Sequence, residues 1–401
     1  MTRKALNPVT LATIIVIMYM TMPIVSVFIS TYITTYAYML LSVFLIGFIA
    51  LSGGLRRLNA MIYLLFPFAI YIACTFFTKA DSILLWGYQS ILFILPVTLG
   101  FYYVYYKDEI TGVFSAIIMS LLLLTVITTI IGLIQFPYAA RVLATIAESD
   151  NPENLRYSWH NIGGYEFVYT TVLLYPLTIH AYKRKKIPFL VSVLLTLLIF
   201  TVVILSEYAI AFLFILITTV LFFFKRELTA KGIVIFAITG FIFVVVFSGF
   251  FSYLLKTIGN MFGSETIRER LIALSGGTDA LETFDDNRIW LYRNNIDIFL
   301  HNPLFGTMFG NDSGAAGHSQ ILITLAQHGI LGGMALFFMY RCIYRSFFRP
   351  FRHIPGYGYY FLVFIEAIML SSINTGFFLF VLTFCAPILF CSISDYKQEE
   401  Y

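Results

Sequence analysis

Long apolar runs alternate with short polar breaks along almost the whole chain. The first three runs extend from Val9 to Ile29, from Thr35 to Leu51 and from Ala60 to Phe77. A run of roughly 17 to 25 apolar residues is long enough, as a helix, to cross the hydrocarbon core of a bilayer, which is about 30 Å thick. The pattern therefore predicts a series of membrane-spanning helices.

About twelve spans are expected in all. The run from Ile187 to Phe224 holds 38 residues, which is too many for one crossing, so we expect two helices joined by a tight external turn at Ser206-Glu207. The tenth span begins near His318 and ends in the basic run from Arg341 to Arg352. The other spans are expected at residues 83–106, 110–136, 167–182, 233–254, 357–373 and 377–394.

Basic residues give the spans an orientation. The strongest basic cluster, Lys183 to Lys186, follows the sixth span, and cytoplasmic loops carry an excess of Lys and Arg. With this cluster inside, both termini are cytoplasmic and two long polar segments, at about 137–166 and 255–317, are external. The second is a large external loop between helices 9 and 10. Except for Lys79, the cations on the predicted outside lie in these two segments, where orientation does not explain them.

Composition agrees with a membrane protein. Hydrophobic residues make up 60% and charged residues 11% of the 401 positions, whereas about a quarter of the residues in a soluble domain are charged. We therefore expect an all-α integral membrane protein with a single polytopic domain over residues 1–401. The sequence does not suggest nucleic-acid binding. Its four cysteines lack the spacing of a metal or redox site, so we interpret them as packing residues.

Charge, histidine and glycine concentrate between Asp285 and Gly333. Apolar residues at spacings of three and four predict an amphipathic helix from about Arg288 to Leu300, capped by Asp285 or Asp286. This stripe consists of Ile289, Tyr292, Ile296 and Phe299. Such a helix would lie along the membrane surface or on the helix bundle. An ordinary surface helix with solvated arginines is the alternative to a functional one.

Two histidines belong to the span after this segment. His318, at its mouth, could act as a general base, because the unperturbed pKa of histidine is near 6.5, or it could anchor the helix end at the interface. His328 lies ten residues farther on, about 15 Å along a helix, so the two histidines do not share one small site. We interpret Gln327 and His328 as structural, because polar groups inside a membrane are costly unless they are paired.

Five short motifs in order give the segment a family resemblance. They are Arg-x-Trp (Arg288, Trp290), Asn-Pro-Leu-x-Gly (Asn302–Gly306), a Gly-rich run (Gly310–Gly317), His-Ser (His318, Ser319) and Gly-Ile-Leu-Gly (Gly329–Gly332). This order resembles the C-terminal signature of the O-antigen polymerase and ligase superfamily. The resemblance implies a GT-C-like glycosyltransferase fold and an undecaprenyl-diphosphate-linked sugar as substrate at the outer face of the bacterial cytoplasmic membrane.

The resemblance also implies roles for particular residues. Arg288 would bind the diphosphate of the donor, and His318 would be the base or would position the acceptor. Many relatives have an arginine after a serine at a mid-chain external turn, whereas this chain has Ser206-Glu207, so phosphate binding would be shared with other external groups. The residues expected to bind the diphosphate or the glycan are Arg141, Arg156, His160, Glu207, Arg268, Arg270, Arg293 and Asn302.

General chemistry supports these roles. The planar guanidinium of arginine pairs with two phosphate oxygens at once. Diphosphate leaves readily once its charge is offset, so transfer needs charge stabilisation, positioning and a base. No carboxylate-rich metal site is obvious, because a helix cap explains Asp285 and Asp286. We therefore expect a metal-independent, inverting transfer without a cofactor.

The leading hypothesis is a repeat-unit polymerase, which transfers a glycan from its undecaprenyl-diphosphate donor to a second lipid-linked repeat unit. A ligase of the same fold, which moves the finished glycan to another acceptor, is the closest alternative. A flippase for the same lipid-linked unit is an alternative of another class, although transporters commonly have internal repeats and none is visible here. The expected partners are the lipid-linked oligosaccharide, the bilayer, and a chain-length regulator and flippase of the same pathway.

Overall fold

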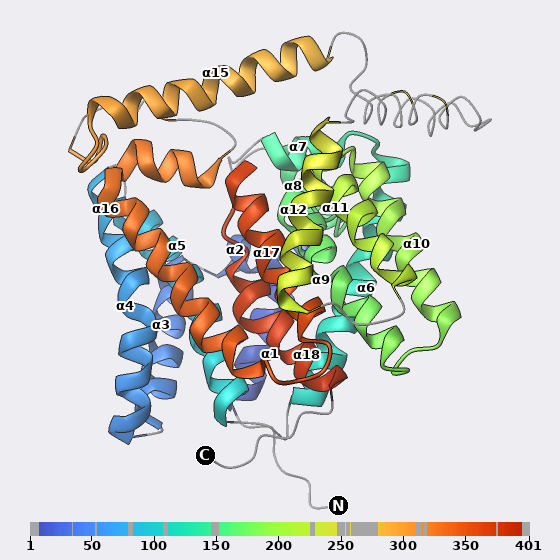
Figure 1. Cartoon of the computed structure of the whole chain (residues 1–401). Helices are drawn as coiled ribbons and strands as arrows, with labels where there is room; N and C mark the ends of the chain where they lie inside the picture. Colours follow the sequence, from blue (N-terminus) through green and yellow to red (C-terminus); the bar gives the residue numbers. More distant parts are fainter. Residues whose placement is uncertain are drawn as a thin grey trace, which may run out of the picture.

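The computed structural model of the chain describes residues 8–33, 35–52, 54–78, 83–106, 111–145, 152–224, 229–246, 253, 257, 280–309, 315, 319–373 and 376–394. Every regular element within these residues is helical, which confirms the predicted all-α class. Most helices run side by side in a bundle, and one long helix lies across one end of it (Figure 1).

The first predicted span is two helices. Helix α1 (Pro8–Thr21) and helix α2 (Pro23–Tyr32) are bent by 110° at the break between them. Pro23 lies in the first turn of α2, where its missing N–H breaks no helical hydrogen bond, and Met22 before it is extended, with φ −121° and ψ 107°. The predicted span from Val9 to Ile29 therefore contains a sharp bend at Met22.

Four helices that follow begin and end close to the predicted spans. They are α3 (Thr35–Ser52), α4 (Gly54–Thr78), α5 (Ile83–Tyr106) and α6 (Thr111–Gln135). Helix α3 packs against α4 and α5, whereas α6 packs against α1, α10 and α18. Helices that are distant in the sequence therefore pack side by side.

Short helices occupy the first long polar segment. Helices α7 (Ala139–Thr145) and α8 (Pro152–Trp159) precede α9 (Tyr165–Lys183). The long apolar run then divides into α10 (Phe189–Ser206) and α11 (Ala209–Thr219), which continues into the 3-10 turn η2 (Val220–Phe223). Glu207 ends α10 in a left-handed conformation, with φ 59°. The predicted turn at Ser206-Glu207 is confirmed.

The C-terminal half contains the long helix across the end of the bundle. Its elements are α12 (Ala230–Val246), α15 (Ala280–His301), α16 (Gln320–Ile343), the π-helix η3 (Tyr344–Phe348), the 3-10 turn η4 (Arg349–Phe351), α17 (Tyr357–Ile373), the π-helix η5 (Val381–Cys385) and α18 (Ala386–Ile393). Helix α15 is the one that lies across the bundle (Figure 1). Gly329 interrupts α16 with non-helical angles, φ 60° and ψ −154°.

Several helices have the length and composition of membrane spans. Within the described residues, four stretches pass this test, and the bent pair α1–α2 would be a fifth if it is counted as one span. The four are Asn59–Phe77, Gly112–Gln135, Phe189–Ser206 and Gln320–Phe351. Shorter apolar helices accompany them. The described part thus has the character of a membrane protein, and the expected twelve spans remain a prediction.

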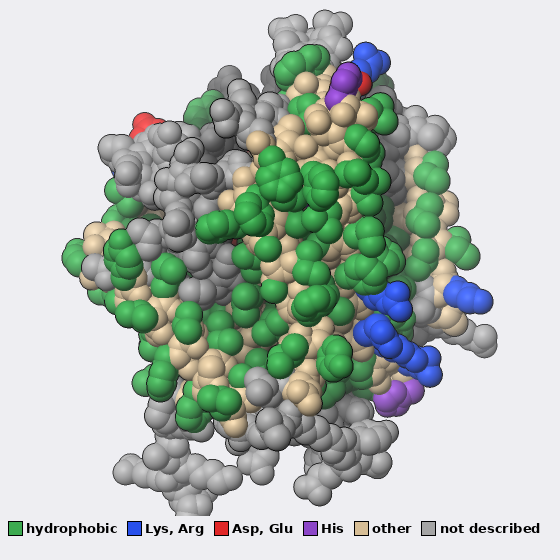
Figure 2. Space-filling model, turned by 90° about the vertical axis from the view of Figure 1, so that its left-hand side faces the viewer, with side chains coloured by type: hydrophobic (Ala, Val, Ile, Leu, Met, Phe, Trp, Pro, Cys, Tyr) green, Lys and Arg blue, Asp and Glu red, His purple; other side chains and the backbone are tan. Residues whose placement is uncertain are grey.

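The sides of the bundle are apolar. Exposed aromatic side chains include Tyr63 and Phe66 on α4 and Phe337 on α16. The side chain of Phe337 is 62% exposed. Figure 2 shows hydrophobic side chains covering this face, with Lys and Arg gathered in its lower part and a small charged group at its top. A broad apolar surface between two charged ends fits a bundle whose sides contact lipid.

The two ends of the bundle differ. One, which we name the α15 end, holds α7, α8, α15 and the Glu207 turn (Figure 1). The other, the basic end, holds the turn Lys183–Lys186, where Arg184 Nη2 donates to the Pro355 carbonyl at 3.4 Å and Lys183 donates to the Phe224 carbonyl. Each end therefore joins segments that are distant in the sequence.

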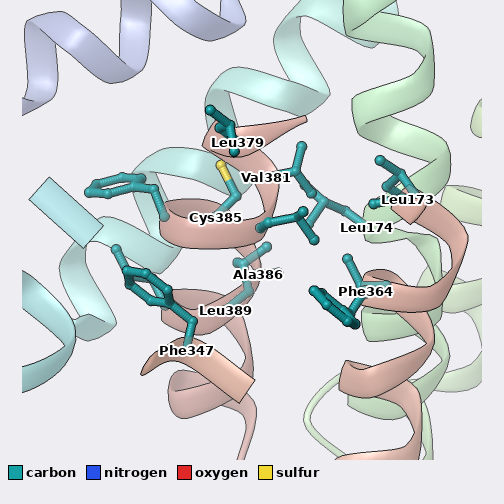
Figure 3. Packing of buried hydrophobic residues seen from close by; sticks show 14 of the residues in the cluster. Leu173, Leu174, Phe347, Phe364, Leu379, Val381, Cys385, Ala386 and Leu389 are labelled. Atoms are coloured by element: carbon teal, nitrogen blue, oxygen red, sulfur yellow. The ribbon is translucent and has the colours of Figure 1, made fainter. Parts of the chain in front are cut away.

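The core is packed largely by aromatic and aliphatic side chains of α5, α9, α17, η5 and α18. The ring of Tyr360 stacks between Phe348 and Phe390, with centroid distances of 4.3 and 4.5 Å. Figure 3 shows Phe347 and Phe364 among the aliphatic side chains of this core, with Cys385 inside it. Cys74, Cys385 and Cys391 are buried, as expected of packing residues.

Candidate functional site

Helix α15 carries the segment that the sequence singles out. The predicted helix forms, but it begins at Ala280 instead of near Arg288. Asp285 and Asp286 therefore lie inside the helix, and the prediction that one of them caps it is wrong. The helix starts earlier than predicted because the sequence from Leu281 to Asp286, although it does not continue the apolar stripe, contains no Gly or Pro that would stop a helix.

The face of α15 that turns toward the bundle differs from the predicted stripe. Asn295 is fully buried, and Tyr292 Oη donates to the carbonyl of Ile373 at the end of α17, at 3.3 Å. Ile296, which the stripe included, is 43% exposed. Arg293 and Asp297 are both exposed, and no ion pair joins them among the described residues. The buried face is thus shifted around the helix toward Asn295.

The turn after α15 docks into the break in α16. The N–H groups of Ile330 and Leu331 donate to the carbonyls of Pro303 and Leu304, at 2.8 and 3.3 Å. In the opposite direction, the N–H of Thr307 donates to the carbonyl of Ala326 at 3.1 Å. The break at Gly329 frees backbone groups of α16, and the turn satisfies them. Two of the five motifs, Asn302–Gly306 and Gly329–Gly332, therefore meet in space.

Glycine is required on both sides of this contact. Gly306 and Gly329 have φ of 59° and 60°, a left-handed conformation that L side chains rarely adopt. A Cβ at Gly306 would lie 2.4 Å from the Ala326 carbonyl oxygen, and one at Gly329 would lie 2.4 Å from the carbonyl carbon of Leu304. The two backbones pack too closely for any side chain. Packing alone therefore requires glycine at both positions, whether or not these residues take part in a reaction.

A polar cluster lies beneath this contact, between α4 and the first part of α16. Gln320 Nε2 donates to Tyr71 Oη at 3.3 Å, and Tyr71 Oη lies 3.3 Å from Thr324 Oγ1. The rings of Tyr71 and His328 meet edge to face, 5.9 Å apart. His328 is buried in this cluster, in accord with a structural role, whereas Gln327 is half-buried.

The helix that follows Ser319 begins with a side-chain cap. Ser319 Oγ accepts a hydrogen bond from the backbone N–H of Leu322 at 3.2 Å and is buried. This satisfies one of the free N–H groups at the start of α16. The serine of the His-Ser motif therefore has a capping role.

The loop between α8 and α9 is fixed at the same end of the bundle. Asn161 Oδ1 accepts from the N–H of Ile24 at 3.2 Å, and its Nδ2 donates to Thr128 Oγ1 at 2.9 Å. The N–H of Gly163 donates to Thr129 Oγ1 at 2.8 Å. These bonds tie the loop to α6 and to the start of α2. The hydrogen bonds thus hold the loop in place directly after Arg156 and His160.

Two predicted substrate-binding residues share one aromatic ring in this loop. The guanidinium of Arg156 lies over the ring of Phe136, 4.8 Å from its centroid, and the ring of His160 lies 5.1 Å from the same ring. Both side chains are exposed. A cation held by a ring face keeps its charge available to solvent. Arg156 and His160 thus form a small basic site at the α15 end.

The Glu207 turn completes this end. Tyr208 Oη donates to the carbonyl of Ala140 at 2.6 Å, which joins the turn to α7. The ring of Tyr208 also packs against Tyr165 and Tyr169, with centroid distances of 5.6 and 5.9 Å. Glu207 itself is half-buried. The turn that Tyr208 joins to α7 therefore carries an acid.

The remaining predicted residues are placed only in part. Asn302 and Arg293 are exposed at the α15 end. Arg288 belongs to α15 and Arg141 to α7, but their side chains lie outside the described residues. His318, Arg268 and Arg270 also lie outside the described residues. Of the predicted residues that the structure describes, Arg156 and His160 lie against one ring, that of Phe136.

Sequence reasoning identified His328 as structural but missed the other members of its polar cluster. Gln320, Thr324 and His328 recur at a spacing of four and so lie on one face of a helix, a signal that was available. Their partner Tyr71 lies in an apolar run and carries no such signal. Within the described residues, no three His, Cys, Asp or Glu side chains gather to hold a metal ion. The cluster is suited to hydrogen bonding and to fixing the helix end.

Comparisons with known proteins give no further information on the site. No protein-family model, no curated protein and no solved structure matches the chain.

Proposed function

We propose that the protein is a membrane glycosyltransferase of the O-antigen polymerase type. It would join a glycan on an undecaprenyl-diphosphate donor to a second lipid-linked repeat unit, at the external face of a bacterial cytoplasmic membrane. The proposal includes about twelve spans in a GT-C-like arrangement, with both termini in the cytoplasm. One observation carries it: the five motifs from Arg288 to Gly332 occur in the order of the superfamily signature.

The geometry of the α15 end supports this proposal. Two of the five motifs, Asn302–Gly306 and Gly329–Gly332, contact each other through their backbones. Exposed Arg293 and Arg156 supply positive charge at the same end. Diphosphate is a strong anion, so a substrate held at the membrane surface would be attracted to this end.

The proposed reaction has a simple balance. The bond between the anomeric carbon and the diphosphate oxygen breaks, and a glycosidic bond forms to the acceptor hydroxyl. The proton of that hydroxyl goes to a base, for which His318 is the proposed residue. Arg288 would offset the charge on the departing undecaprenyl diphosphate.

Substitution of the two proposed catalytic residues tests the assignment. We expect Arg288→Ala and His318→Ala each to abolish the ladder of polymer lengths in a deletion strain complemented with the variant, because charge stabilisation and proton removal would be lost. Membrane abundance should be unchanged. Trp159→Ala, an exposed substitution on α8, is the control. Polymer at the wild-type level in both variants would contradict the assignment.

The purified enzyme separates the polymerase from its alternatives. Full-length protein with a synthetic lipid-diphosphate repeat unit should yield elongated lipid-linked product, with and without a chelator. A ligase would leave the unit unextended and transfer it to a different acceptor. A flippase would move the unit across a vesicle membrane without any change in its mass.

A further inference from the structure

A cavity lies on the side of the bundle, near the basic end. It has a volume of about 260 Å³ and is enclosed by α6, α9, α10 and α18, which pack against one another. These helices form the right-hand side and the lower part of Figure 1. Its mouth is at the basic end, opposite α15, and no described residue of α15 lines it.

The wall of the cavity changes in polarity along its length. Ser115, Thr178 and Ser392 lie near the basic ends of α6, α9 and α18. Farther in, the lining consists mostly of Leu, Ile and Val, and the hydroxyl of Thr171 donates to the carbonyl of Val168 at 2.7 Å. The cavity therefore has a polar mouth and an apolar interior.

Lys186 lies at this mouth. Among the described residues that line the cavity, it is the one charged side chain. It directly follows the exposed Lys185 in the basic turn after α9. A cation above an apolar channel matches an amphiphile with an anionic head and a hydrocarbon chain.

The depth of the cavity matches one leaflet of a bilayer. Along α6 the lining runs from Ser115 to Val126, and eleven residues of helix span about 16 Å. The hydrocarbon core of a bilayer is about 30 Å thick, so one acyl chain occupies about 15 Å. A phospholipid with its head group at Lys186 would therefore fit its chain within the cavity.

The cavity also opens toward the lipid side of the bundle. Met119 and Leu123 of α6 line it and are each 37% exposed. A chain can therefore enter sideways from the bilayer without passing through the polar end of the protein. We propose that this cavity binds one acyl chain of an anionic phospholipid from the leaflet at the basic end, with the phosphate at Lys186.

Two matched pairs of variants test the proposal in the full-length purified protein. Lys186→Gln removes the charge at the mouth, and Lys185→Gln removes the charge of a neighbour that is also exposed but does not line the cavity. Leu123→Trp fills the side opening, and Leu124→Trp makes the same change on a neighbouring exposed leucine outside the lining. Phosphatidylglycerol and phosphatidylcholine with identical chains are the probes, and native mass spectrometry measures their binding.

We expect the wild-type protein to retain one phosphatidylglycerol molecule more tightly than phosphatidylcholine. Lys186→Gln should weaken phosphatidylglycerol binding about fivefold, as expected for one lysine at an anionic surface, and leave phosphatidylcholine binding unchanged. Leu123→Trp should weaken the binding of both lipids. Lys185→Gln and Leu124→Trp should have effects of less than about twofold.

Other results would overturn the proposal. Equal retention of the two lipids by the wild-type protein would exclude recognition of the anionic head. Equal effects of the two lysine variants on lipid binding would indicate nonspecific electrostatic attraction to the basic end. Equal effects of the two tryptophan variants would exclude binding of the acyl chain inside the cavity. Displacement of the phospholipid by inorganic phosphate would show that the acyl chain contributes little. The lysine pair changes no core residue, so a folding defect in Leu123→Trp would not prevent the test.

Discussion

Asn161 shows how one side chain can hold a loop at the α15 end. It is buried, and its amide bonds to Ile24 on one side and to Thr125 and Thr128 on the other. Its φ of 54° is left-handed, which asparagine tolerates better than most residues. The sequence drew attention to its neighbour His160, which is exposed. Loops lack a periodic pattern, so sequence alone does not tell which of two adjacent polar residues turns inward.

Substitution of Asn161 should therefore destabilise the protein. We expect Asn161→Ala to lower the free energy of unfolding by about 2–4 kcal/mol, because buried partners lose hydrogen bonds and alanine is strained at this φ. Denaturant titration in detergent, followed by circular dichroism, measures the change. Asn161→Gly removes the amide but keeps the backbone conformation, so its loss should be smaller. A change of less than about 0.5 kcal/mol for Asn161→Ala would contradict the stabilising role of the amide.

At the scale of elements, the break in α16 and the turn after α15 depend on each other. The turn fills the gap that Gly329 leaves, and its own backbone is held by Ala326, Ile330 and Leu331. Neither part has this shape for local reasons alone. A helix interrupted without such a partner would leave buried N–H and carbonyl groups unpaired.

Alanine at Gly329 should disrupt this contact. We expect Gly329→Ala to cost about 2–4 kcal/mol of unfolding free energy, because the new Cβ combines backbone strain with a clash against the Leu304 carbonyl. The same denaturant titration measures it. Gly47→Ala in α3 is the matched control, because a Cβ there meets no atom within 4 Å. Equal stability of the two variants would show that the α16 break tolerates a side chain.

These elements also show what the sequence could and could not predict. The turn at Ser206-Glu207 was predictable because an apolar run too long for one crossing must turn back near its middle. Pro23 was a local signal for the α1–α2 bend, but the length of the apolar run favoured the prediction of a single span. The Gly329 break had no sufficient local signal, since its cause is a turn more than twenty residues earlier in the chain.

At the scale of the whole molecule, apolar sides separate two polar ends of different character. The α15 end carries the docked motifs, the Arg156–His160 site and Arg293. The basic end carries Lys183–Lys186 and the exposed arginines after α16. Our proposed function places the first outside the cell and the second in the cytoplasm.

Cysteine labelling tests this orientation. We expect Arg293→Cys to react with a membrane-impermeant maleimide on intact spheroplasts, and Lys185→Cys to react only in inside-out vesicles, because each position is exposed at an opposite end. Mass shift of the purified protein measures labelling. Phe44→Cys, on the exposed apolar side of α3, should react from neither side. Reaction of both end variants in the same preparation would contradict the orientation.

The break at Gly329 also resolves a mismatch of length. The apolar stretch Gln320–Phe351 contains 32 residues, and a straight helix of that size would be about 48 Å long, well beyond a hydrocarbon core of about 30 Å. The part after the break, from Ile330 to Phe351, would span about 33 Å, which a bilayer accommodates with little tilt. Residues 320–328 are thereby released from crossing and can form the floor beneath α15.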